Sequence, residues 1–430
     1  MLHRKYEVNT NPIAFETATV HRLANGITVT LERLPHLHSA SVGVWVRAGS
    51  ANEAPQENGL AHFLEHLFFK GTKNRNVREI MEAIEGRGGQ INAFTSREHT
   101  CLHVRMLSQH VGVGIEILAD ILNNSLFCDM EKERNVILEE IASIEDTPDD
   151  LVHDLLAAYQ WPDHPLGRPI SGTQASVSAI TRDDVQKFFE RCYVPENLFI
   201  SVAGNFDEAA VLDQIRMAFE PIPPMKAPGD AGPPPWRSGL RQVARDIAQA
   251  HICLGFPAPT LQDDARYVCD VLSSIIGGGS TSRLFERIRE QEGLAYAIYS
   301  FHSFHTHAGM MGIYAGVAPQ QCMRAMDLIF GELRRIREEP VPERELEMNR
   351  EQIKGNLLMS MESTSARMSR MAKSMMYYGR IVPLEEIVRK VDAVTAEDVM
   401  ACARRAFTKE NCAAVVLHSL TGCKVGEIAL

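Results

Sequence analysis

The sequence predicts an α+β protein of two similar halves, each a mostly antiparallel β-sheet with helices packed on one face, together forming a clamshell. Its 430 residues are long for a single hydrophobic core. A segment rich in proline and glycine, EPIPPMKAPGDAGPPPWRSG at 220–239, is typical of an extended linker. We therefore expect a first half at 1–220, a linker at 221–239 and a second half at 240–430.

A repeated pattern supports this division. In the first half GGQINAFTSREHTCLHVRM leads to VGVGIEILADIL, and in the second GLAYAIYSFHSFHTHAGMMGIYAGV leads to CMRAMDLIFGEL. Each pattern reads as a strand pair led by glycine and followed by an amphipathic helix, so the two halves are predicted to be related units.

The first half begins with HRLANGITVTLERL, in which Asn25-Gly26 is a strong signal for a β-hairpin turn. SASVGVWVRAG continues it as a second strand. Further strands are expected near 91–106 and 197–204. Helical patterns are expected near 59–70, 76–86, 109–123, 130–146 and 182–191.

The second half opens with the strand AHICLGFPAP and then a helix. Its methionine-rich run LLMSMESTSARMSRMAKSMMYYG predicts adaptable helix packing, with a peptide-contacting surface as the alternative. SIIGGGSTSRL lacks the lysine of a phosphate-binding loop, so Gly277 to Gly279 are read as a flexible turn. His302, His305 and His307 are expected to be satisfied or exposed, although His305 and His307 alternate onto one face.

Composition narrows the class of protein. Apolar and charged fractions of 45% and 23% are ordinary for a globular chain, and no run of about 18 apolar residues predicts a membrane span. The start lacks the apolar region of a secretory signal, and nine scattered cysteines fit a reducing cytoplasm. The net charge of −11 disfavours nucleic acid as a partner; it fits either cationic partners or a solvated acidic surface.

The stretch HFLEH at 62–66 places three polar residues in an otherwise apolar helix. At 100° per residue, His62, Glu65 and His66 fall within an arc of about 100°. Two imidazoles at this spacing can hold one Zn²⁺, and Glu65 can accept a proton from water bound to the metal. The order H-x-x-E-H is that of the inverzincins. The alternative is a pair of hydrogen-bonded core histidines beside an unrelated glutamate.

A third zinc ligand is expected from DMEKERNVILEEIASIED. The apolar stripe of this helix is predicted to be Val136, Ile137, Ile141 and Ile144. Glu140 lies within this stripe, whereas Glu139 neighbours polar residues, so Glu140 is predicted to complete the site. Glu133 lies two turns earlier on the same face, either as a partner of a ligand or as a solvated charge.

These motifs resemble the pitrilysin family of zinc peptidases, most closely its mitochondrial processing peptidase-like branch with its small bacterial members. HFLEH is followed by FFKGT and INAFTSREHT, and Glu140 follows His66 by 74 positions, with Glu133 seven before it. The resemblance implies one zinc per chain, with His62, His66 and Glu140 as ligands, Glu65 as general base and Glu133 as accessory residue. It also implies that Asn92, Ala93, Phe94 and Thr95 form an edge strand that binds the substrate.

In the second half RIREQEGLAYAIYS resembles the family stretch that carries an arginine and a tyrosine seven apart, here Arg289 and Tyr296. The resemblance implies that both bind the peptide backbone and help to stabilise the oxyanion of the tetrahedral intermediate. Because the zinc motif and this pair lie on one chain, it also implies a homodimer whose sites are shared between subunits.

The sequence therefore predicts a zinc-dependent endopeptidase that cleaves peptides or unfolded, presequence-like segments and binds neither nucleic acid nor membrane. A non-catalytic scaffold or assembly subunit is the alternative from another class, and a different metal hydrolase is a third. The intact motif favours the peptidase.

Overall fold

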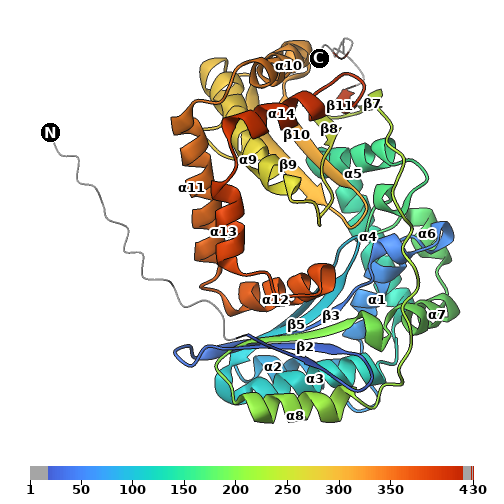
Figure 1. Cartoon of the computed structure of the whole chain (residues 1–430). Coiled ribbons are helices and arrows are strands. Elements are labelled where there is room, and N and C mark those ends of the chain that lie inside the picture. Colours follow the sequence, from blue (N-terminus) through green and yellow to red (C-terminus); the bar gives the residue numbers. More distant parts are fainter. Residues whose placement is uncertain (1–17, 420–427, 429) are drawn as a thin grey trace.

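The computed structural model describes residues 18–419, 428 and 430, and it contains two β-sheets that each carry a layer of helices (Figure 1). The first sheet has the order β1-β2-β6-β3-β5-β4. Its strands are β1 (Thr19–Arg22), β2 (Thr28–Arg33), β3 (Ser39–Val46), β4 (Gln90–Thr95), β5 (Thr100–Leu107) and β6 (Leu198–Gly204). The second sheet has the order β7-β11-β8-β10-β9. Its strands are β7 (Gly239–Arg245), β8 (Ala250–Pro257), β9 (Ala295–Phe304), β10 (Gly309–Val317) and β11 (Ala413–Ser419).

The internal repeat is confirmed by the strand order. Leaving β1 aside, each sheet places its strands in the chain order first, fifth, second, fourth, third. The first strand pairs with the fifth in parallel, and every other neighbouring pair is antiparallel. Two mostly antiparallel sheets built on the same plan are what the sequence predicts.

The helices of the first half follow its strands closely. They are α1 (Leu60–Phe68), α2 (Val77–Glu85), α3 (Val111–Asn124), α4 (Met130–Glu145), α5 (Pro148–Gln160), α6 (Gln174–Ala179), α7 (Arg182–Cys192) and α8 (Glu208–Phe219). A continuous apolar core joins one face of the sheet to α1, α2, α3, α7 and α8. The predicted hairpin is also present, because β1 and β2 pair across a turn in which Gly26 has a φ of +102°.

The second half has a corresponding helical layer. Its helices are α9 (Ala265–Gly277), α10 (Cys322–Glu338), α11 (Glu343–Ser360), α12 (Thr364–Tyr378), α13 (Leu384–Asp392) and α14 (Ala396–Ala406), with a π-helical turn at Phe285–Gln291. Short 3-10 turns complete the chain at Ser50–Asn52, Pro55–Glu57, Ser108–His110, Pro165–Gly167, Pro195–Asn197 and Pro319–Gln321. Gly277 ends α9 instead of belonging to a flexible turn. In the described part of the chain, no helix is both long enough and apolar enough to cross a membrane.

Each half sends one helix to the other sheet. Leu151, Val152 and Leu156 of α5 pack in a cluster with residues of β8 and β11. Met368, Met371 and Met376 of α12 pack in a cluster with Trp45 and Phe199 of the first sheet. The part of the methionine-rich run that forms α12 is therefore a packing helix, as predicted, whereas Met359 at the end of α11 is 63% exposed. The second face of each sheet is covered by a helix from the opposite half, which the prediction of one covered face did not include.

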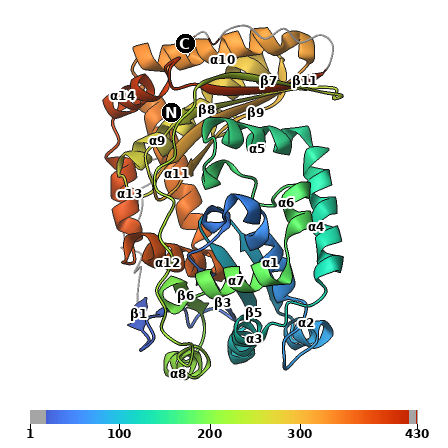
Figure 2. The same ribbon diagram turned by 90° about the vertical axis from the view of Figure 1, so that its right-hand side faces the viewer.

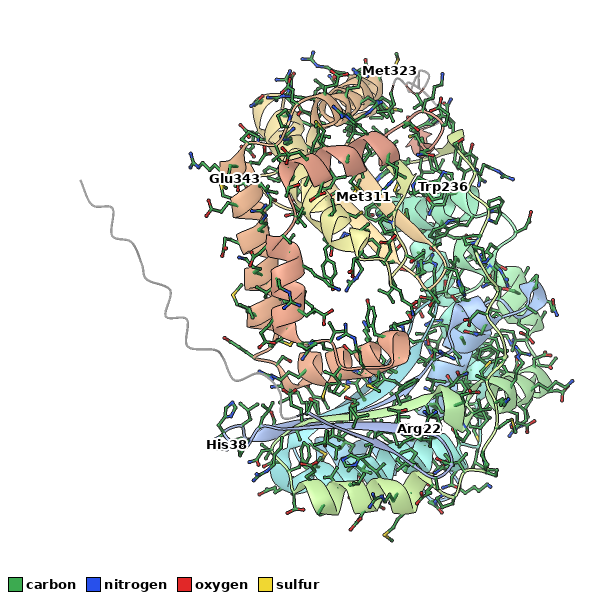
Figure 3. All side chains as sticks on the ribbon, viewed as in Figure 1. Arg22, His38, Trp236, Met311, Met323 and Glu343 are labelled. Carbon is green, nitrogen blue, oxygen red and sulfur yellow. The ribbon has the colours of Figure 1, made fainter. Side chains whose placement is uncertain are left out.

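The two sheets are joined along opposite sides of the molecule. In Figure 1 α11 and α13 run along one side, and α4 and α5 run along the other, which Figure 2 turns toward the viewer. Residues 222–238 contain no helix or strand. Trp236 of this segment packs beside α5, where its ring lies 6.3 Å from that of Trp161 (Figure 3). The domain boundaries drawn at 220 and 240 remain a prediction.

Candidate metal centre

Helix α1 has one polar face, and its other residues are apolar and buried. Its six buried residues are Leu60, Ala61, Phe63, Leu64, Leu67 and Phe68. It begins after Gly59, whose φ of +95° and close approach to the backbone of Ser171 and Gly172 leave no room for a side chain. Packing on all its apolar sides holds His62, Glu65 and His66 in fixed positions.

Helix α4 brings a carboxylate to the two histidines. Glu140 Oε2 lies 3.7 Å from His62 Nε2 and 3.7 Å from His66 Nε2. One ligand atom from each of the three residues lies within 4.8 Å of the others, and this is the one such group found among the described residues. Ligand atoms about 2.0–2.1 Å from a tetrahedral zinc lie roughly 3.3–3.5 Å apart, so the spacing fits this metal.

The apolar stripe predicted for α4, on which the prediction of Glu140 as the third ligand depends, is only partly present. Ile137 and Ile141 are buried, but Val136 is 47% exposed, so the stripe is narrower than predicted. Glu140 itself is 44% exposed and points toward the histidines instead of into the core. Glu140 therefore lies beside the histidines without belonging to a fully apolar stripe, and its role as a metal ligand stays a prediction.

Glu133 lies behind His66. Its Oε2 is 3.3 Å from His66 Nδ1, and its Oε1 is 2.8 Å from Lys70 Nζ. The residue is only 3% exposed, which excludes the alternative of a solvated helix charge. A carboxylate that accepts a hydrogen bond from Nδ1 leaves Nε2 unprotonated, which is the form that binds a metal.

The electrostatics of the centre also suit a cation. Burial, together with the neighbouring His66, lowers the pKa of His62 to about 4, so this imidazole is neutral at pH 7. Burial raises the pKa of Glu65, and nearby Thr95 opposes part of that shift. Among the described residues Glu65 Oε2 and His62 Nδ1 are buried without a hydrogen-bond partner. An unpaired carboxylate oxygen of Glu65 beside three convergent metal-ligand atoms is what a site for a zinc-bound water requires.

A cavity of about 350 Å³ lies against these residues. It is lined by His62, Glu65, Phe94, Thr95, Glu140, Ile144, Asp154, Ile170 and Ser171. Strand β4 forms one wall and is the last strand of its sheet, pairing only with β5 among the described strands. Asn92 and Phe94 are exposed on one face of β4, and Ala93 is buried in the core. The free edge can accept a further strand beside the candidate ligands.

Arg289 and Tyr296 are brought together with each other, but not with the zinc motif of the same chain. The guanidinium of Arg289, in the π-helical turn, lies 5.6 Å from the centre of the Tyr296 ring, and Tyr296 is 80% exposed on β9. Neither lines the cavity beside His62. The three histidines of 302–307 pair with different carboxylates, Asp270, Glu98 and Asp230, and form no common site.

Two supports of α1 were missed by the sequence reading. Glu53 accepts hydrogen bonds from the N–H groups of Gly59 (3.0 Å) and Ala61 (2.7 Å) and from Asn58 (3.2 Å). Glu53 therefore accepts hydrogen bonds from N–H groups at the N-terminus of α1. Gly59 occupies the cap position of this helix but has no side chain to accept them. A glycine three positions before HFLEH, with an acid six positions before that glycine, was the available signal.

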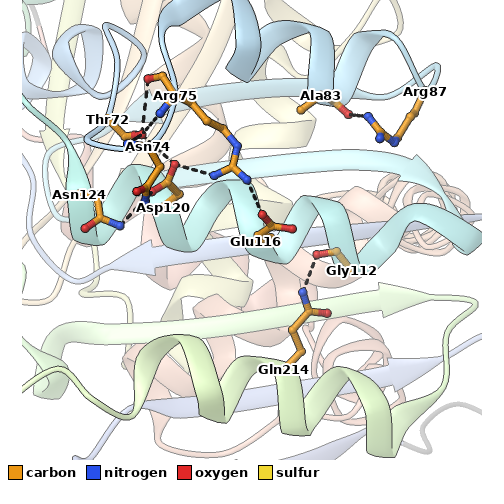
Figure 4. A network of polar contacts seen from close by, with 10 residues as sticks. All are labelled: Thr72, Asn74, Arg75, Ala83, Arg87, Gly112, Glu116, Asp120, Asn124 and Gln214. Atoms are coloured by element: carbon orange, nitrogen blue, oxygen red, sulfur yellow. Dashed lines mark hydrogen bonds and ion pairs between the residues drawn. The ribbon is translucent and has the colours of Figure 1, made fainter.

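The second support holds the chain that leaves α1. Asp120 of α3 accepts hydrogen bonds from Thr72 Oγ1 (2.8 Å), Asn74 Nδ2 (2.6 Å) and Asn124 Nδ2 (2.9 Å), and it pairs with Arg75 (2.8 Å) (Figure 4). Arg75 also pairs with Glu116. This buried network ties residues 72–75 to α3 and so fixes the far end of the metal-binding helix.

We expect Glu53→Ala to lower the free energy of unfolding by about 1–3 kcal/mol, because three buried donors lose their acceptor. Zinc affinity should fall as well, since His62 follows the capped Ala61 directly. Chemical denaturation and zinc titration measure the two effects. Glu57→Ala is the control: Glu57 caps the preceding turn through Ala54 and pairs with Arg191, and no hydrogen bond or ion pair joins it to α1 among the described residues. Unchanged zinc affinity in Glu53→Ala would contradict the assigned role.

Comparison with known proteins is consistent with this geometry. The family model described as Insulinase (Peptidase family M16) matches residues 28–174, and the model described as Peptidase M16 inactive domain matches residues 179–353. The uncharacterized zinc protease YmxG of Bacillus subtilis is 38% identical over 397 residues, which cover 92% of this chain and 97% of that protein. An uncharacterized zinc protease of Streptomyces coelicolor is 38% identical over 399 residues, covering 90% and 87%.

Solved structures share the fold. A protease from Helicobacter pylori superposes with a TM-score of 0.88 at 22% identity, covering 93% of this chain and 99% of that one. A Pseudomonas fluorescens protein described as a peptidase M16 inactive domain also has a TM-score of 0.88, at 18% identity, covering 95% and 100%. Sequence matches over nearly the whole chain, two matching family models and the strand plan agree: this chain belongs to the pitrilysin family of zinc metallopeptidases, peptidase family M16.

Proposed function

We propose that this protein is a zinc-dependent endopeptidase in which His62, His66 and Glu140 hold the metal and Glu65 acts as general base. The observation that carries the proposal is the meeting of two imidazoles and a carboxylate within 4.8 Å, beside Glu65, whose Oε2 is buried without a hydrogen-bond partner among the described residues. When bound there, one zinc ion per chain would acidify a water molecule and polarise the scissile carbonyl.

The residues of the chain supply the remaining steps. Glu65 accepts a proton from the attacking water and later delivers it to the leaving amine, for which its burial and raised pKa are suited. Glu133 holds His66 in its metal-binding tautomer. The free edge of β4 at Asn92–Thr95 binds the substrate main chain as an added strand.

The substrates proposed here are peptides or unfolded, presequence-like segments. An edge strand recognises main-chain N–H and C=O groups, so only an extended segment can pair with β4. A folded protein keeps these groups in its own hydrogen bonds. This restriction supports an endopeptidase of flexible chains.

The experiment for the proposed function combines metal content with cleavage. Purified protein should carry one zinc per chain and cleave an internally quenched peptide between internal residues. Removal of zinc by a chelator should abolish cleavage, and one equivalent of added zinc should restore it. Protein that binds no zinc and cleaves no peptide would instead favour a non-catalytic assembly subunit.

We further propose that the protein acts as a homodimer, with each site pairing the zinc half of one subunit with Arg289 and Tyr296 of the other. The supporting observation is that Tyr296 is largely exposed and does not line the zinc cavity of its own chain. Mixing Glu65→Gln and Tyr296→Phe subunits should restore one intact site in each mixed dimer. Activity no higher than that of the separate variants would contradict shared sites.

A cytoplasmic location is proposed from the cysteines. Seven cysteines of the described chain are free thiols, and six of them are buried; the seven are Cys101, Cys128, Cys192, Cys253, Cys269, Cys402 and Cys412. Thiols that stay unpaired are typical of a reducing compartment. Cell fractionation that places the protein outside the cytoplasm would contradict this assignment.

A further inference from the structure

A second cavity, of about 400 Å³, adjoins the zinc cavity. We call it the cationic cavity, after the four basic residues in its wall: Arg97, Arg266, Arg370 and Lys373. Among the described residues of the wall, Glu98 is the single carboxylate. The cavity lies between the β4–β5 turn, the start of α9, the end of β9 and α12, so both halves of the chain contribute to it.

The carboxylate in the wall is already engaged. Glu98 accepts a hydrogen bond from the N–H of Thr306 (2.9 Å) and pairs with His305 (3.5 Å). Arg97 pairs weakly with Asp154 (3.9 Å) and donates to the carbonyl of Leu166 (2.9 Å). Arg370 donates to the carbonyl of Val382.

The other two cations have no acid partner. Within the described chain no carboxylate lies within 4.0 Å of Arg266 or Lys373. Arg266 donates to the Tyr267 hydroxyl (2.6 Å), and its guanidinium lies 4.2 Å from the Tyr267 ring and 5.7 Å from the Tyr378 ring. These contacts fix the guanidinium plane without neutralising its charge. Asp270 is close enough to interact electrostatically with Arg266, but it pairs with His302.

Lys373 is the least compensated of the four. Its Nζ lies 5.7 Å from the centre of the Trp45 ring, and it makes no hydrogen bond or ion pair with any described residue. Surrounding protein lowers the pKa of Lys373, which reflects poor hydration without a compensating charge. A cavity wall with an excess of cations, two of them unpaired, favours an anion.

The cationic cavity lies next to the end of β4, so a bound peptide substrate could supply the anion. Thr95 lines the zinc cavity, and the next residues, Ser96 and Arg97, line the cationic cavity. Ile170 lines both. A peptide paired with β4 and continuing past Thr95, at about 3.3 Å per residue, therefore leads directly into the cationic cavity.

The remaining wall is suited to an amino-acid side chain. Leu261, Phe304, Val382 and Ile387 provide apolar surface next to the two unpaired cations. A small inorganic anion would leave this surface uncovered, whereas a peptide residue that carries a carboxylate would cover both parts. Arg266 offers the fork-shaped donor set that matches a carboxylate.

We propose that the cationic cavity is a substrate subsite in which Arg266 and Lys373 bind a carboxylate of the peptide, either an acidic side chain or the C-terminal carboxylate. The inference rests on the proposed peptidase function and deepens it. It assigns to the enzyme a preference for peptides that carry a negative charge on one side of the cleaved bond.

The experiment measures binding to the Glu65→Gln protein, which should not turn the peptide over. Fluorescence anisotropy compares three versions of one labelled peptide: a free acid with one glutamate, its C-terminal amide, and the free acid with glutamine for glutamate. We expect one of the two neutralised peptides to bind about 10-fold more weakly at low salt, about 1.4 kcal/mol. Weakening by the amide identifies the C-terminal carboxylate, and weakening by glutamine identifies the side chain.

Second-site variants test the residues. In Arg266→Gln and in Lys373→Gln, both combined with Glu65→Gln, the affinity ratio between charged and neutralised peptide should fall toward 1. Arg78→Gln is the matched control, because Arg78 is exposed and, among the described residues, pairs only with Glu82. Arg266→Gln loses contacts with two tyrosines and could unfold for that reason. In that case Lys373→Gln alone tests the subsite, because Lys373 makes no hydrogen bond with the described residues.

The outcomes separate this inference from the proposed function. A ratio of 1 in the parent protein, or an unchanged ratio in the folded variants, overturns the cationic cavity as a carboxylate subsite even if the enzyme is active. A ratio near 10 that falls in the variants supports the subsite. Because binding is measured without turnover, failure of cleavage would overturn the proposed function alone.

Discussion

Replacing Glu65 with glutamine should abolish peptidase activity while leaving the zinc in place. The amide has nearly the size of the carboxylate, so the packing of α1 is retained, but it cannot accept a proton from the attacking water. General-base catalysis contributes about 10²–10⁴-fold, and a loss in kcat of that size is expected. Metal analysis and cleavage of a quenched peptide, measured on the same sample, test both halves of this expectation.

The comparison for this variant is Glu139→Gln, which removes one carboxylate from an exposed position on α4. It should keep both zinc and activity. Full activity in Glu65→Gln would rule out Glu65 as the base. Loss of zinc from Glu65→Gln would point instead to a metal-binding role for this carboxylate.

The second large effect is expected at the third ligand. Glu140→Gln should weaken zinc binding by more than about 100-fold, because changes to groups that merely support a ligand already cost about 10–100-fold. Glu140 Oε2 lies 3.7 Å from both histidine Nε2 atoms. Among the described residues, no other carboxylate of α4 joins the two histidines in a group that could bind a metal. Competition with a chromophoric chelator measures the affinity.

Two neighbouring variants calibrate this result. Glu139→Gln should bind zinc like the parent protein. Glu133→Gln should show an intermediate loss, since Glu133 contacts His66 Nδ1 and Lys70 and lies behind the ligand set. If Glu139→Gln loses zinc and Glu140→Gln keeps it, the assignment of the ligand is reversed.

Much of the first half was predictable because its signals are local. The expected helices at 59–70, 76–86, 109–123, 130–146 and 182–191 agree with α1, α2, α3, α4 and α7 within a few residues. Apolar periodicity and capping residues lie within each of these segments and do not depend on distant contacts. The same periodicity put His62, Glu65 and His66 on one face of one helix.

The limits of periodicity show at α4. Ile137 and Ile141 are buried as expected, whereas Val136 is exposed and Glu140 is half exposed. A helical phase identifies which residues share a face, but the neighbour that covers this face is set by packing. Here α1 presents histidines to part of that face, so a carboxylate is tolerated there without a fully apolar stripe.

The sequence by itself determined three things: that each half repeats a strand pair followed by a helix, that the first half holds α1, α2, α3, α4 and α7, and that H-x-x-E-H forms one face. Each of these is read from spacing within a segment; α5, α6 and α8 were not predicted. Only the tertiary structure decided that α5 and α12 each cross to the opposite sheet, that Glu53 caps α1, and that Arg266 and Lys373 meet beside the end of β4. These features join residues far apart in the chain. Their partners are selected by burial and charge in the folded molecule, which no local pattern records.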